Sequence, residues 1–155
     1  MITEDEFLFF TDRALDGMIA VVTELGDDLV NRRPGPPETN SPYAIVTHCV
    51  GVIEFWVGRM VAGREVRRDR EAEFRATGTV AGLVARVEKA KQQVRADLAA
   101  ADPRAPLRQE TPEKYRGTPI GRTQGAALLH VYEELAQHRG HLELTRDVLR
   151  VHNGS

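Results

Sequence analysis

The side chains best suited to chemistry in this 155-residue sequence lie near its C-terminal end. His130, Glu134, His138 and His141 follow one another at intervals of four, four and three residues. On a helix, this spacing places side chains on one face with neighbours within reach of each other. Imidazole nitrogens and carboxylate oxygens are ligands of zinc and similar divalent ions. The spacing of Glu134 and His138 therefore suits a shared metal on consecutive helical turns.

Another histidine stands out because of its neighbours. His48 lies on an apolar stripe that includes Ile45, Val52 and Phe55 at helical spacing, where packing would ask for a hydrocarbon. A third metal ligand on a second helix would occupy such a position. The carboxylate of Glu134, if buried, would also need a positive partner to offset its lost solvation. A divalent metal held by His48, Glu134 and His138 would account for the positions of all three side chains.

Simpler explanations exist for each of these observations. A single histidine on an apolar stripe is often a hydrogen-bonded core residue. Glu134 and His138 could be a surface pair that stabilises its helix by a few tenths of a kcal/mol. The three side chains could also hydrogen-bond one another without a metal. The residues alone leave these alternatives open.

Three further residues near this set are candidates for the site. Cys49 is next to His48, but consecutive helical residues point about 100° apart, so we expect a packed side chain rather than a fourth ligand. His141 suits either a pocket position with an acid or base role or a helix surface. His130 is equally compatible with a supporting role and with a surface position.

Helical signals mark the elements that must position these residues. Thr3 and Glu6 form a capping-box pattern, Ser41 with Pro42 is a strong helix start, and Thr79 can cap a third helix. Leucines recur every seven residues near the C-terminus, which indicates a buried helical seam. The predicted helices span residues 4–26, 41–62, 79–101 and 123–150, and the leucines are Leu128, Leu135, Leu142 and Leu149.

The connections between these helices are long. Residues 31–40 and 102–122 are rich in proline and glycine and are predicted to be loops, the second long enough to serve as a binding loop. Residues 64–70 are charged and are predicted to be solvated. Four side chains of the second loop could bind an acidic or sugar-bearing thiol, although charged loop residues usually face water. These residues are Lys114, Tyr115, Arg116 and Arg122. The fold class predicted for residues 1–155 is all-α, a single four-helix bundle domain with long interhelical connections.

Composition narrows the function classes. The chain has 21 basic and 23 acidic residues scattered along it and a formal net charge of -2, so no nucleic-acid footprint is present. A single cysteine fits a reducing compartment. The acidic N-terminus lacks the pattern of a signal peptide, and we expect that no segment reaches membrane-spanning length. These features predict a cytoplasmic protein.

Two segments resemble the DinB-like superfamily, in its mycothiol-dependent branch. The first runs from Asn40 to His48 and continues through Gly51–Trp56, and the second is His130–His141. With the order of the predicted helices, the resemblance covers nearly the whole chain. It implies a four-helix bundle that binds a divalent metal, zinc or nickel, through one ligand on the second helix and two on the last.

The resemblance also implies a ligand set and a class of reaction. Many members use three histidines, whereas this sequence resembles the His, Glu, His version found in mycothiol-dependent maleylpyruvate isomerase, which carries over to His48, Glu134 and His138. That isomerase continues into a second domain, and the printed sequence reaches Ser155 soon after its last predicted helix, so we do not expect maleylpyruvate as substrate. The stand-alone relatives are grouped as thiol S-transferases linked to detoxification, and relatives frequently form homodimers.

The expected reaction is S-transfer from a low-molecular-weight thiol such as mycothiol to a small electrophile. Thiol-assisted isomerisation is the other expected form. Two imidazoles and a carboxylate leave a coordination position open, as in catalytic zinc sites. A metal there would stabilise a thiolate near neutral pH. The alternative is a metal-binding stress or sensing protein without turnover, which would need no pocket beside the open position.

Overall fold

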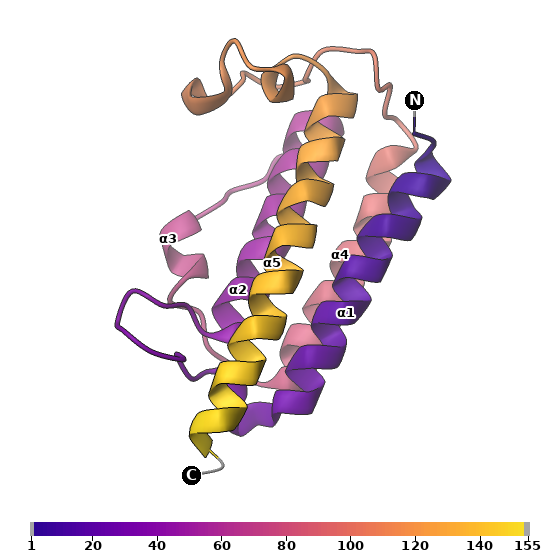
Figure 1. Cartoon of the computed structure of the whole chain (residues 1–155). Coiled ribbons are helices and arrows are strands. Elements are labelled where there is room, and N and C mark those ends of the chain that lie inside the picture. The colour runs from indigo at the N-terminus through magenta and orange to yellow at the C-terminus, as the bar shows by residue number, and fades with distance from the viewer. Residues whose placement is uncertain (1, 154–155) are drawn as a thin grey trace.

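Helices make up all the regular structure of the part of the chain that the computed structural model describes, residues 2–153 (Figure 1). This confirms the predicted all-α class. The elements are α1 (Glu4–Val30), α2 (Pro42–Ile53), the π-helix η1 (Glu54–Val61), α3 (Arg70–Glu73), α4 (Val80–Leu98), the 3₁₀ turns η2 (Glu113–Tyr115) and η3 (Pro119–Gly121), and α5 (Gln124–Asn153).

Four long rods lie side by side and form the bundle. They are α1, α4, α5 and the rod made of α2 and η1; α5 packs on α1 and α2, and α4 packs on the same two helices from the other side (Figure 1). Burial of apolar side chains between the rods is the main stabilising contribution to such a fold. All four leucines of the predicted seam on α5 are buried, and the side chains with least exposure include Leu15, Met18, Ile45, Met60 and Leu83.

The predicted helix starts are confirmed by their hydrogen bonds. Thr3 and Glu6 form a reciprocal capping box on α1. Ser41 accepts from the amide of Ala44 at 3.2 Å, and Thr79 caps α4 in the same way. At Gly26 the backbone leaves helical geometry, with φ of 67°, but the helix resumes and continues to Val30. The first helix therefore ends later than predicted.

The second rod changes type along its length. It was predicted as one α-helix to residue 62, but from Glu54 to Val61 it is a π-helix. Its last turn shows the i→i−5 pattern, in which the amide of Ala62 donates to the carbonyl of Val57 at 2.9 Å. Hydrophobic spacing over so short a segment does not separate the two helix types. The extent was therefore predicted correctly and the type was not.

The charged segment after this rod is solvated only in part, because Glu65, Arg67, Asp69 and Arg70 are exposed as predicted but two arginines are not. Arg64 forms a bidentate ion pair with the buried carboxylate of Asp97 on α4. Arg68 pairs with Glu73 at the end of the short helix α3, which lies against α2. Both arginines turn inward because each has a buried carboxylate to neutralise.

The expectation that no segment reaches membrane-spanning length was wrong for the second rod. Pro42–Val61 is 20 residues long with a hydropathy of 1.4, enough by length and composition to cross a bilayer. However, 83% of this window is buried inside the bundle. Its apolar character is explained by its place in the core, beside α4 and α5.

Candidate metal centre

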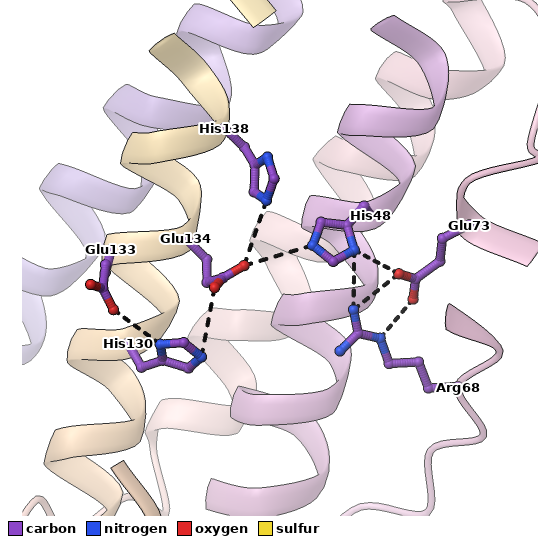
Figure 2. Close-up of polar contacts among 7 residues, drawn as sticks. All are labelled: His48, Arg68, Glu73, His130, Glu133, Glu134 and His138. Carbon is purple, nitrogen blue, oxygen red and sulfur yellow. Dashed lines mark hydrogen bonds and ion pairs between the residues drawn. The ribbon is translucent and has the colours of Figure 1, made fainter. Parts of the chain in front are cut away.

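The structure brings together the three residues predicted as metal ligands. His48 projects from α2, and Glu134 and His138 project from α5 on consecutive turns (Figure 2). Their ligand atoms all lie within 4.8 Å of one another. Oε2 of Glu134 lies 3.7 Å from Nε2 of His48 and 3.6 Å from Nε2 of His138, so the carboxylate faces both imidazoles.

Core packing on both helices fixes this meeting point. On α2, the fully buried Ile45 and the buried Val52 lie on either side of His48. On α5, Leu135 and Leu142 are fully buried and set the rotation of the helix, which turns Glu134 and His138 toward α2. The side chain of His48 is 5% exposed, whereas those of Glu134 and His138 are 26% and 24% exposed. The site is therefore closed on the α2 side and accessible on the α5 side.

The donor set suits a divalent cation. The neighbouring imidazoles of His138 and then His48 hold the pKa of Glu134 well below its usual range, so this residue is a carboxylate. Two imidazoles and one carboxylate are a common set for zinc and other transition metals. Among the described residues, the buried Nδ1 atom of His138 has no hydrogen-bond partner. The Nε2 atom of His138, which faces Glu134, is therefore the nitrogen of this ring that is placed to act as a ligand.

A second carboxylate touches His48 from the opposite side and was missed at the sequence level. Oε2 of Glu73 lies 2.8 Å from Nδ1 of His48, and Arg68 donates to both oxygens of Glu73 at 2.6 and 3.0 Å (Figure 2). The ring of Phe74 stacks on that of His48 at 4.9 Å. One signal was present in the sequence, because Gly51 lies one turn after His48 in the middle of a helix, where glycine is unfavourable.

His130 belongs to the surroundings of Glu134. It is buried, with Nδ1 at 3.1 Å from Oε2 of Glu133 and Nε2 at 3.9 Å from Oε1 of Glu134. Its ring contacts Trp56 at 5.2 Å and Tyr115 at 5.3 Å. Of its two interpretations, the structure favours a supporting role beside the carboxylate over a surface position.

The long loop before α5 reaches this region through one residue. Tyr115 packs on Trp56 at 5.0 Å and is partly buried, so the prediction that it faces water was wrong. Lys114, Arg116 and Arg122 are exposed, as predicted. Tyr115 ties the loop to the bundle because its ring completes an aromatic cluster with Trp56 and His130.

Cys49 and His141 stand outside the three-residue group, as expected. Cys49 is fully buried, and burial first, then the nearby carboxylate of Glu134, raises the pKa of its thiol far above the usual range. His141 is exposed, with its ring 6.0 Å from that of His138. Partial desolvation of the ring, and then the neighbouring His138, lower the pKa of His141. A neutral imidazole thus stands beside the open side of the site.

The chain matches a known protein family over most of its length. The family model described as MST, mycothiol-S-transferase, matches residues 7–150. This range contains nearly all of the four rods of the bundle, the three clustered residues and the Glu73 carboxylate. No curated protein matches the chain.

Proposed function

Because the chain belongs to the mycothiol-S-transferase family, within the DinB-like superfamily, it is a thiol S-transferase, and we propose that its reaction takes place at His48, Glu134 and His138. The observation that carries this proposal is the convergence of two imidazoles and one carboxylate within 4.8 Å. Family membership also favours the enzyme over the alternative of a metal-binding protein without turnover.

The proposed cofactor is one divalent metal ion, zinc or nickel, bound by these three side chains. Support comes from the charged state of Glu134 and from the Nε2 atoms of His48 and His138, both of which face its carboxylate. Three protein ligands leave a position for an exchangeable group. When bound, the metal would favour the thiolate form of a coordinating thiol near neutral pH.

The chain's own residues have distinct parts in this proposal. The buried His48 provides the rigid side of the site, and His130 stands against Glu134 and restricts its rotation. The more exposed Glu134 and His138 form the side that a thiol and an electrophile can approach. His141 stands at this side and is proposed to accept or donate a proton.

The proposed reaction joins mycothiol, through its sulfur, to a small electrophile. The thiol gives its proton to a base, for which His141 is proposed. Its sulfur forms a bond to the electrophilic carbon, and the leaving group departs with the electron pair of its bond. Thiol-assisted isomerisation is the second form that this chemistry could take. The proposed role is detoxification of electrophiles in the cytoplasm. The whole chain is proposed to act as a single domain.

A homodimer is proposed from apolar surface at one end of the bundle. Four of the large hydrophobic side chains left exposed are Ile2, Phe9 and Phe10 near the start of the chain and Leu129 on α5. Phe10 contacts Tyr132 on α5 at 5.7 Å, so the two helices share this surface. Contiguous apolar surface of this kind is typical of association sites.

The function is tested by following thiol consumption with a generic electrophile such as chlorodinitrobenzene. Mycothiol, bacillithiol and glutathione are compared for wild type, His48→Ala and, as a control, Glu71→Gln on the exposed side of α3. We expect turnover with mycothiol in wild type and control, loss on chelation, and recovery when zinc is added back. Equal rates for wild type and His48→Ala would overturn the proposed site.

A further inference from the structure

The side of the His48 ring that faces away from Glu134 makes a specific contact that takes no direct part in the proposed reaction. Nε2 of this ring faces Glu134 and His138, while Nδ1 lies 2.8 Å from Oε2 of Glu73 (Figure 2). Glu73 ends the short helix α3, and its side chain is only 7% exposed. A buried carboxylate at this distance accepts the hydrogen of Nδ1 and leaves the lone pair on Nε2.

Arg68 holds the carboxylate of Glu73 in place. Its Nε atom donates to Oε1 at 2.6 Å and its Nη2 atom donates to Oε2 at 3.0 Å, a two-pronged contact that fixes the plane of the carboxylate. The arginine also neutralises the charge that Glu73 brings into the protein. Nη2 of Arg68 also lies 3.3 Å from Nδ1 of His48, farther than the 2.8 Å from Nδ1 to Oε2 of Glu73. Because a guanidinium only donates, the acceptor for a hydrogen on Nδ1 is Glu73.

Gly51 creates the space in which this contact forms. A Cβ atom at this position would lie 2.0 Å from Oε1 of Glu73 and 2.7 Å from its Cδ atom. The carboxylate therefore rests directly on the backbone of α2, one turn after His48. Any side chain at position 51 would push Glu73 away from His48.

Phe74 completes the enclosure from the residue that follows Glu73. Its ring stacks on that of His48 with an interplanar angle of 26°. Consecutive residues of one short segment thus restrain both the proton and the plane of the imidazole. This is more restraint than packing alone requires of a core histidine.

We propose that Glu73, oriented by Arg68 and admitted by Gly51, is a positioning residue that fixes the tautomer and the orientation of His48 for metal binding. This rests on the proposed function, because it takes His48 to be a metal ligand. Partners of this kind on the second nitrogen of a ligating histidine are worth about 10- to 100-fold in metal affinity.

Zinc affinity of the full chain, measured by competition with a chromogenic chelator, tests this role. The variants are Glu73→Gln, which removes the charge, and Gly51→Ala, which displaces an intact Glu73. The control is Glu71→Gln, two residues away on the same helix, whose side chain is 88% exposed and pairs with Arg75. We expect affinity to fall about 10- to 100-fold in both variants and by less than about two-fold in the control.

Nitrogen NMR of His48 in the metal-free protein provides a second readout that a purely structural role would not change. Wild type should show the hydrogen on Nδ1, and Gly51→Ala should show a mixture of tautomers. Circular dichroism and thermal melting of each metal-free variant establish that it is folded. If the variants melt at a lower temperature than wild type while their zinc affinity and their His48 tautomer are unchanged, the inference is overturned.

The outcomes also separate this inference from the proposed function. Wild type that binds no stoichiometric zinc would reject the metal centre itself. Wild type that binds zinc, with Glu73→Gln and Gly51→Ala binding it equally well, would reject only the role of Glu73.

Discussion

Nδ1 of His48 lies 2.8 Å from Oε2 of Glu73, although the two residues are 25 positions apart in the sequence. One nitrogen of this imidazole is therefore committed to the protein, and the other is directed at Glu134 and His138. A histidine that served only core packing would not need two carboxylates on opposite sides of its ring. The arrangement connects α3, α2 and α5 through a single side chain.

Replacement of Glu134 by glutamine is expected to weaken zinc binding by more than about 100-fold, beyond the effect of a supporting residue. The reason is that the variant loses the one anionic ligand of the set. Glu133→Gln is a matched control on the same helical turn, because its side chain is 55% exposed and pairs with Nδ1 of His130, the nitrogen that faces away from Glu134. Chelator competition measures both, and equal affinities would contradict the assigned ligand.

The charge of Glu134 should persist in acid. The imidazoles of His138 and His48 lower its pKa well below 4.5, so the folded, metal-free protein keeps this carboxylate ionised where an unfolded chain begins to protonate it. The resulting stabilisation is fully present above the ordinary glutamate range and is lost progressively as the pH falls from that range toward the lowered pKa. Wild type should therefore lose more thermal stability on acidification than Glu134→Gln. If the melting temperatures of the two proteins fall in parallel from pH 6 to about pH 3, this prediction is contradicted.

Cys49 is expected to resist thiol reagents in the folded protein. It is fully buried, and burial raises its pKa far above the usual range, so at pH 8 neither the thiolate nor access to it is available. Titration with a disulfide reagent should find no reactive thiol in native protein and one per chain in guanidinium chloride, since the chain has a single cysteine. Rapid modification of native protein would place Cys49 at the surface, against the structure.

Tyr115→Ala should loosen the loop before α5 from the site. Trp56, the single tryptophan, is 3% exposed and packs against Tyr115 at 5.0 Å. Removal of the ring should shift the tryptophan emission to longer wavelength and lower the free energy of unfolding by about 1 kcal/mol or more. Lys114→Ala, next to it but exposed, is the control. Identical emission spectra for the two variants would show that the loop does not cover Trp56.

Much of the fold was predictable because its signals are local. Caps such as Ser41 and the seven-residue leucine pattern of α5 depend on neighbouring residues, and both were confirmed. The convergence of His48 with Glu134 and His138 was predictable because each stood on a helical face that had to be buried. The metal itself remains a prediction.

What the sequence did not predict depends on contacts between distant segments. Arg68 and Glu73 look like ordinary surface charges until α3 folds back on α2. The inward turn of Arg64 depends on Asp97, which lies 33 residues away. Gly51 was visible, but its meaning depends on which side chain rests on it. Tyr115 likewise acquires its position from Trp56 and His130, on other elements.

The most direct test of the metal centre is elemental analysis of protein purified without a metal-affinity column. We predict about one divalent ion per chain in wild type, and loss of that ion in His138→Ala and in His48→Ala, each still folded by circular dichroism. Glu71→Gln should retain the full amount. Wild type without stoichiometric metal, or histidine variants that keep it, would contradict the assignment of His48, Glu134 and His138 as its ligands.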